Sequence, residues 1–292
     1  MRKDLRRPVR IHRSARSGGD GIPARKRWGQ HFLASPETAQ KIVEAAEVHA
    51  SETVIEVGPG DGALTRPLAA RCARLLAIEI DPLRAERLAA EFGDAGSVRI
   101  FQGDALDRRF GEWLAAAGFS PPAALIANLP YNVATPILTA ALEEPQAVFK
   151  IVATVQREVA QRLVALPGDE QYGYLSVLAA SRARGRILFH LPPGAFRPAP
   201  RVTSSVVELS PLPRPLASAQ RSEALALASL GFRSRRKTLA NALAGRAPRA
   251  VWESALAAIG RSPRARAETL SLDDFVAISR IVSPPHGAPP AL

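Results

Sequence analysis

One nine-residue stretch constrains the fold more than any other part of the sequence. VIEVGPGDG (residues 54–62) leads from an apolar segment into Gly58, Gly60 and Gly62, and a helix-length segment follows. Glycines let a backbone approach a ligand closely, and the first turn of a helix offers unpaired N–H groups. The Gly-x-Gly-x-Gly spacing departs from the Gly-x-Gly-x-x-Gly fingerprint of dinucleotide-binding folds. It indicates either a plain strand-to-helix turn or a binding turn for another nucleoside.

Short apolar runs alternate with helix-length segments on both sides of this turn. Strands are expected at residues 53–58, 75–80, 98–103, 123–128, 149–156, 186–191 and 204–210. Helices are expected at 36–50, 64–72, 82–92 and 135–143, and from 157 to 166. Such alternation predicts an α/β fold with a Rossmann-like, doubly wound parallel sheet.

The chain changes character after its last expected strand. Pro211, Pro213 and Pro215 mark a linker, and only helices are expected beyond it, at 222–231, 234–244, 249–259 and 273–281. The expected division is a disordered basic arm at 1–24, a cofactor-binding sheet domain at 25–210, a linker at 211–221 and a small helical domain at 222–292.

Two acids lie at the carboxyl ends of expected strands, at the edge where such sheets bind ligands. Glu79 ends the second strand, and its carboxylate can accept hydrogen bonds from both hydroxyls of a ribose. Asp104 follows the third strand and can accept from an adenine amine, although a helix N-cap is its plainer role. Together with the glycine turn, these acids favour S-adenosylmethionine, which has no phosphate and an amino-acid end that backbone groups can hold.

Asn128-Leu129-Pro130-Tyr131 follows the fourth strand and carries the candidate chemistry. An adenine amine is a poor nucleophile because its lone pair is delocalised into the ring. The Asn128 side-chain oxygen and a backbone carbonyl at Pro130 can each accept one of its N–H groups and aim the lone pair at a methyl donor. Tyr131 offers a face on which an extruded base can stack. The plainer interpretation is a strand-ending turn.

The formal charge of +12 is concentrated in two segments. Residues 1–27 hold ten basic and two acidic residues, and residues 231–266 hold nine basic and one acidic residue. Arg233, Arg236 and Lys237 are expected on one helical face, with Arg235 beside them. Contact with nucleic-acid phosphates is the functional interpretation, and a solvated surface is the alternative. The single cysteine and the scattered histidines indicate no metal site.

Several segments resemble the KsgA/RsmA family, which dimethylates two adjacent adenosines near the 3′ end of small-subunit ribosomal RNA. They are KRWGQHFL (26–33), VIEVGPGDGALT (54–65), AIEIDP (77–82), QGDAL (102–106), NLPYNVATPIL (128–138), VQREVAQRL (155–163), YGYLSV (172–177), AFRPAPRVTSSVV (195–207) and FRSRRKTLANAL (232–243). The resemblance runs from about residue 25 to about residue 272, in order along the chain.

The resemblance implies roles for particular residues. Contacts with S-adenosylmethionine are implied at His31, Leu33, Gly58, Glu79, Asp104 and Asn128. The family usually has Asn at the position of His31. Phe196 matches an aromatic residue that would pack on the target base opposite Tyr131. The implied partner is small-subunit ribosomal RNA, free or in an immature subunit.

Other interpretations stay open at this point. They are a large-subunit methylase of the erythromycin-resistance type, a non-catalytic RNA-binding assembly factor and, less favoured by the glycine spacing, a dinucleotide oxidoreductase. Because no apolar run approaches the roughly 20 residues of a membrane helix, no membrane partner is expected. A cytoplasmic location fits, with mitochondrial targeting by the arginine-rich arm as the alternative.

Overall fold

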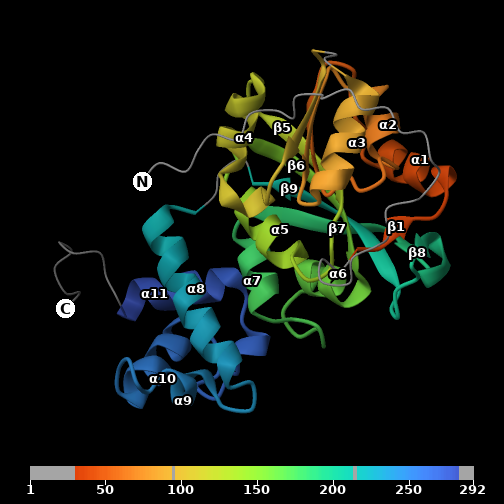
Figure 1. Ribbon diagram of the computed structural model, residues 1–292. Coiled ribbons are helices and arrows are strands. Elements are labelled where there is room, and N and C mark those ends of the chain that lie inside the picture. Colours follow the sequence, from red (N-terminus) through yellow and green to blue (C-terminus); the bar gives the residue numbers. More distant parts are fainter. Residues whose placement is uncertain (1–29, 94–95, 213–215, 283–292) are drawn as a thin grey trace. The chain divides into compact units, whose positions relative to one another are not determined.

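A computed structural model describes residues 30–93, 96–212 and 216–282, and the expected basic arm at 1–24 lies outside these residues (Figure 1). The chain forms two compact units. The first contains the described residues up to Ala160 together with Arg186–Pro211. The second contains Gln161–Gly185 and the described residues from Leu212 onward.

A seven-stranded sheet forms the centre of the first unit, with the strand order β4-β3-β2-β5-β6-β9-β7. The strands are β2 (Thr53–Val57), β3 (Arg74–Glu79), β4 (Val98–Gln102), β5 (Ala123–Asn128), β6 (Val148–Gln156), β7 (Ala183–Leu191) and β9 (Ser204–Pro211). The five strands from β4 to β6 pair in parallel, and β9 is antiparallel to β6. The predicted Rossmann-like α/β class is therefore confirmed, with an antiparallel addition at one side.

Helices cover the sheet because its strands are apolar on both faces. Side chains such as Val54, Leu75 and Ala77 pack against α1 (Pro36–Ala45), α2 (Thr65–Ala69) and α3 (Pro82–Phe92). In Figure 1, α4 (Phe110–Ala117) and α5 (Ala134–Leu142) are drawn across the sheet from α3. In the described part of the chain, no helix has the length and apolar character needed to span a membrane.

Local signals explain where several helices begin and end. Ser35 caps α1 by accepting a hydrogen bond from Thr38 N at 3.3 Å, and Pro36 occupies the first helical position, as expected. Asp81 caps α3 in the same way through Leu83 N at 3.1 Å. Helix α1 ends at Ala45 rather than at residue 50, and Glu47 then adopts a left-handed φ of 47°.

The second unit is helical, as expected, but it begins earlier in the sequence than the expected division. Its helices are α7 (Tyr174–Ala180), α8 (Ser218–Arg233), α9 (Leu239–Ala242), α10 (Arg249–Ala258) and α11 (Leu272–Val282), and α6 (Arg157–Val164) leads into it. Residues 161–185, expected in the sheet domain, belong here because Tyr172 and Val177 pack into the same core as Trp252 and Phe275. The Tyr172 hydroxyl also donates to Leu270 O at 2.8 Å.

The basic stretch at 233–237 does not form the expected helical face. Helix α8 ends at Arg233, residues 234–237 form a turn, and Thr238 caps α9 by accepting from Asn241 N. The expected helix at 234–244 was wrong because the Thr238 cap starts a new, shorter helix. Arg236 and Lys237 are exposed in the turn. Arg235 is also exposed, and it donates to the carbonyls of Glu170 and Tyr172 within the same helical unit.

Gly231 in α8 allows close helix packing, which gives a first testable prediction. A Cβ at this position would lie 2.9 Å from Ala267 Cβ and 2.9 Å from Leu239 Cδ1. We expect Gly231→Ala to lower the free energy of unfolding of the helical unit by about 1–2 kcal/mol, because overpacking outweighs the better helix propensity of alanine. Thermal unfolding followed by circular dichroism measures the effect.

Gly245→Ala is the matched control, since no described atom lies within 4 Å of its added Cβ. Equal stability of the Gly231→Ala and Gly245→Ala proteins would contradict the packing argument.

Candidate active site

Five of the expected cofactor and catalytic residues line one cavity at the carboxyl ends of β2, β3 and β5. The cavity contains about 400 Å³ of space between atoms, part of which is open to solvent. Its walls are Gln30, His31, Phe32, Gly58, Gly60, Glu79, Ile80, Asn128, Leu129 and Pro130. Of the expected site residues, this wall contains His31, Gly58, Glu79, Asn128 and Pro130, although they are widely separated in the sequence.

A second cavity of about 380 Å³ adjoins the first and shares Phe32, Gly58 and Asn128 with it. The expected residue Leu33 and the buried acid Glu56 also line this cavity. The Phe32 ring lies over the bare Cα of Gly60, where an added Cβ would come within 2.7 Å of Phe32 Cε1. The absence of a side chain at Gly60 therefore lets Phe32 form a wall between the two spaces.

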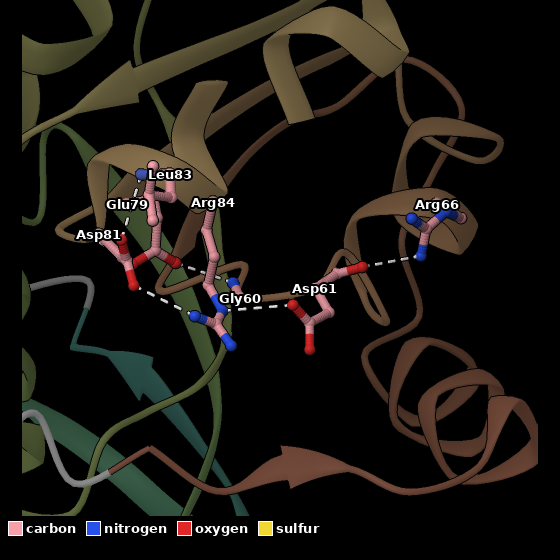
Figure 2. A network of polar contacts seen from close by, with 7 residues as sticks. All are labelled: Gly60, Asp61, Arg66, Glu79, Asp81, Leu83 and Arg84. Carbon is pink, nitrogen blue, oxygen red and sulfur yellow. Dashed lines mark hydrogen bonds and ion pairs between the residues drawn. The ribbon is translucent and has the colours of Figure 1, made fainter. Parts of the chain in front are cut away.

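Glu79 holds the glycine turn against the end of the next strand (Figure 2). Its two carboxylate oxygens accept from Gly60 N and Asp81 N, each at 2.8 Å. Burial raises the pKa of Glu79, while these two backbone donors oppose the shift. The carboxylate is thus fixed in orientation, and its remaining lone pairs can accept from a ligand.

A buried arginine ties the two turns beside the cavity together, as Figure 2 shows. The Arg84 side chain is fully buried and pairs with Asp81 at 3.1 Å and with Asp61 at 3.2 Å. Its guanidinium also lies 4.5 Å from the centre of the Phe32 ring, which is a cation–π geometry. Because a buried charge is stable only with such partners, Arg84 fixes the turn after β2, the turn after β3 and the Phe32 ring in one arrangement.

The side-chain amide of Asn128 has a defined orientation. Asn128 Nδ2 donates to the backbone carbonyl of His31 at 2.8 Å. A carbonyl can only accept, so the NH₂ group must face His31, and Oδ1 is then the atom presented to a ligand. The Pro130 carbonyl accepts from Val133 N at 3.1 Å, which closes the turn and leaves one lone pair. Asn128 Oδ1 and the Pro130 carbonyl are therefore both available as hydrogen-bond acceptors, as the sequence predicted.

The aromatic residues of the site are arranged differently from the expectation. Tyr131 stacks on His31, with ring centroids 5.2 Å apart and an interplanar angle of 25°. The Tyr131 hydroxyl forms a short hydrogen bond with Ser204 Oγ, and burial raises its pKa. Phe196 does not face Tyr131 across an open space: it is only 2% exposed and packs in the core.

Two short strands explain the positions of Leu33 and Phe196. Strand β1 (Phe32–Leu33) pairs antiparallel with β8 (Phe196–Arg197), and Leu33 lies opposite Phe196. Phe196 belongs to the buried core cluster of the first unit, and Leu33 packs against that cluster. The base-stacking role of Phe196 stays a prediction, and its burial in this conformation fits the plain core role.

Asp104 follows β4 at the same edge of the sheet but does not line either cavity. Gly103 N donates to Glu79 O at 2.9 Å, which places the two strand ends side by side. Asp104 Oδ1 caps a short 3₁₀ helix (Ala105–Asp107) through Leu106 N at 3.0 Å. The exposed apolar side chains Ile80 and Leu106 follow these two strand ends.

Glu56 is a candidate residue that the sequence interpretation missed. It lies next to the last residue of β2, is 1% exposed and lines the second cavity. Its Oε2 makes no hydrogen bond to any described atom. Burial raises its pKa to about 8, with the nearby Thr65 hydroxyl and Arg66 opposing the shift and Glu79 adding to it. A carboxylate within the apolar run VIEVG was the available signal, since such burial is costly without a partner.

The buried acid predicts a particular pH dependence of stability. The folded protein retains the Glu56 proton to about pH 8, whereas an ordinary glutamate in the unfolded chain loses it near 4.5. Unfolding therefore releases this proton between those values, and the contribution of Glu56 to stability falls as the pH rises through that range. We expect Glu56→Gln to match the wild type near pH 4 and to be more stable by roughly 3–5 kcal/mol at pH 9.

Urea unfolding at both pH values measures this difference. Glu86→Gln serves as the control because Glu86 is exposed on α3. Parallel stability curves for the wild type and Glu56→Gln from pH 4 to pH 9 would contradict the assignment.

The sheet, the glycine turn and the Asn-Leu-Pro-Tyr loop on a shared cavity are typical of Rossmann-like, S-adenosylmethionine-dependent methyltransferases, and the chain falls in that class. Comparison with known proteins narrows the assignment. The chain belongs to the ribosomal RNA adenine dimethylase family, whose model matches residues 22–283.

Two curated relatives show the extent of the similarity. A protein of Aromatoleum aromaticum called ribosomal RNA small subunit methyltransferase A is 41% identical over 264 residues, covering 89% of this chain and 94% of its own. A protein of the same name from Rubrobacter xylanophilus is 42% identical over 260 residues, covering 89% of this chain and 95% of its own.

Solved structures share the fold. The 23S rRNA methyltransferase ErmE is 24% identical with a TM-score of 0.66, covering 86% of this chain and 98% of its own. A dimethyladenosine transferase from Plasmodium falciparum is 22% identical with a TM-score of 0.68, covering 85% of this chain and 96% of its own. At these sequence identities, the comparison with solved structures shows a shared fold and nothing further.

Proposed function

We propose that this protein transfers methyl groups from S-adenosylmethionine to N6 of two adjacent adenosines near the 3′ end of small-subunit ribosomal RNA, giving N6,N6-dimethyladenosine. The observation that carries the proposal is the position of Asn128, whose oriented amide lines the same cavity as Gly58 and Glu79. The family and the names of the curated relatives support the same substrate.

The residues at the cavity fit the parts of S-adenosylmethionine. Glu79, held by two backbone donors, would accept from the ribose hydroxyls. The unpartnered Oε2 of Glu56 in the adjoining cavity suits a cationic ammonium group, which is the amino-acid end of this cofactor. Asp104 would accept from the adenine amine through the oxygen that does not cap Leu106 N, with Ile80 and Leu106 as the nearby apolar side chains.

His31 and Leu33 would close this site from the N-terminal side. Both line the cavities, and His31 replaces the Asn that is usual in the family. When bound, the cofactor supplies a sulfonium methyl group, an electrophilic carbon that one nitrogen lone pair can attack.

Catalysis by this chain would consist mainly of positioning. Asn128 Oδ1 and the Pro130 carbonyl would accept the two N–H groups of the adenine amine, which turns its lone pair toward the methyl carbon. Such alignment is worth about 7–11 kcal/mol in well-oriented systems. No strong general base is required, because the methylated nitrogen is acidic and releases its proton to water.

The helical unit would supply phosphate contacts. Arg233, Arg236 and Lys237 are exposed around the end of α8 and can bind the RNA backbone without reading its sequence. Arg235 is less suited to this role than expected because it is bonded to two backbone carbonyls. The partner would be small-subunit ribosomal RNA or an immature subunit, in the cytoplasm.

A parallel methylation assay tests the proposal. Unmethylated small ribosomal subunits and large-subunit RNA are incubated separately with the protein and labelled S-adenosylmethionine, and the product nucleosides are analysed by mass spectrometry. We expect N6,N6-dimethyladenosine in the small-subunit sample alone. Product in the large-subunit sample alone would indicate a resistance-type methylase, and RNA binding without any product would indicate a non-catalytic assembly factor.

A further inference from the structure

The His31 side chain is held by two contacts beyond its backbone. Its ring stacks on Tyr131 with centroids 5.2 Å apart, and its Nδ1 lies 2.7 Å from the carbonyl oxygen of Pro198. Because a carbonyl can only accept, Nδ1 carries the proton and donates it. The imidazole is therefore fixed in orientation over the Tyr131 ring.

The Tyr131 ring is itself fixed beside the candidate acceptors. Its hydroxyl is bonded to Ser204, a residue that is fully buried in β9. Asn128 lies three residues before Tyr131, and its amide is bonded to the backbone of His31. A purine whose amine reaches Asn128 and Pro130 is thus brought next to the stacked pair.

The stacked pair leaves no space for a third ring between its members. A ring inserted between His31 and Tyr131 requires about 7 Å, which is twice the contact distance of roughly 3.5 Å between carbon atoms. The observed centroid separation of 5.2 Å is that of a direct aromatic pair. A base can therefore use this face of Tyr131 only if the imidazole moves away.

We infer that, in the protein without RNA, the His31 imidazole occupies the place on Tyr131 that the target adenine takes, so that His31 must be displaced before the base can stack. This inference rests on the proposed function and concerns the same site. His31 is then a positioning residue that sets the cost of base entry, since displacement breaks one aromatic stack and one hydrogen bond.

Removing the ring should make base entry easier. An aromatic stack and a hydrogen bond of ordinary strength together lower the equilibrium constant for displacing the His31 ring by about tenfold or somewhat more. We expect His31→Asn to lower the KM for RNA about tenfold. The Kd of S-adenosylhomocysteine, measured in parallel, reports any separate effect on the cofactor site. Asparagine keeps a polar side chain next to the cavity but cannot stack. His31→Phe keeps a stacking ring without the Nδ1 donor and should give an intermediate KM.

His190→Asn is the matched control, because this exposed histidine on β7 is bonded to Ser205 and does not contact Tyr131. Its KM for RNA should equal that of the wild type. If the wild-type protein methylates the RNA but the KM of His31→Asn for RNA is unchanged or higher, this inference is overturned and the proposed function still stands. Absence of turnover in the wild type would instead count against the proposed function.

A spectroscopic measurement detects the displacement without turnover. In the free protein, the Tyr131 ring current should move the Hε1 resonance of His31 upfield, and the signal is assigned by its loss in His31→Asn. We expect the resonance to move toward the unstacked position when a hairpin RNA from the 3′ end of small-subunit ribosomal RNA is added with S-adenosylhomocysteine. RNA binding that leaves the resonance in place would overturn the inference.

Discussion

Asn128→Ala should lower kcat for RNA methylation by about 10²–10³-fold, the loss typical of removing one preorganised hydrogen-bonding group from an active site. The variant keeps only the Pro130 carbonyl as an acceptor for the adenine amine, so the lone pair is no longer held in line with the methyl carbon. It also breaks the 2.8 Å bond to the His31 carbonyl. Single-turnover methylation under saturating cofactor measures the chemical step directly.

Binding measurements separate this loss from damage to the cofactor site. We expect Asn128→Ala to weaken the affinity for S-adenosylhomocysteine by less than tenfold, because Glu79 and the glycine turn are unchanged. Asn241→Ala, an exposed position in α9, is the control for a general effect of losing an amide. A kcat of Asn128→Ala within fivefold of the wild-type value would contradict the proposed catalytic role of Asn128.

Glu79→Gln should weaken cofactor binding by about 10²-fold, since hydrogen bonds to a charged group contribute roughly 1.5–3 kcal/mol each. The amide of glutamine also has one NH₂ group, which would face a backbone donor, either Gly60 N or Asp81 N. The variant therefore loses the negative charge and the fixed orientation together. Calorimetric titration with S-adenosylhomocysteine measures the affinity.

The kinetic constants of Glu79→Gln should change in a different way from those of Asn128→Ala. For Glu79→Gln we expect a large rise in the KM for S-adenosylmethionine and less than a tenfold change in kcat at saturation. Glu86→Gln is the matched control, because Glu86 is exposed on α3 and lines neither cavity. Unchanged affinity for S-adenosylhomocysteine in Glu79→Gln would show that the ribose is bound elsewhere.

The periodic elements were predictable because their local signals agree with the tertiary structure. The strand at 123–128 and the helix at 82–92 have the bounds expected from the sequence, and the Ser35 cap begins α1 as expected. Helix α4 was missed although Phe110, Trp113, Leu114 and Ala117 form a helical apolar stripe. The periodic apolar residues of α4 were thus visible in the sequence and could have predicted the helix.

Other features depend on contacts between residues far apart in the sequence. The stacking of His31 on Tyr131 and the two-residue pairing of β1 with β8 have no local signature. The burial of Phe196, which lies in that pairing, also has no local signature. The ion pairs of Arg84 with Asp61 and Asp81, which link two turns, also have no local signature in the sequence.

A crystal structure of the protein with S-adenosylhomocysteine and adenosine tests the central claim most directly. The account predicts the ribose hydroxyls of the cofactor on Glu79 and the adenosine amine within hydrogen-bond distance of Asn128 Oδ1 and the Pro130 carbonyl. The sulfur should then lie next to that amine, on the side of Gly58. A cofactor bound away from Gly58 and Glu79, or an adenosine whose amine does not reach Asn128, would contradict the account.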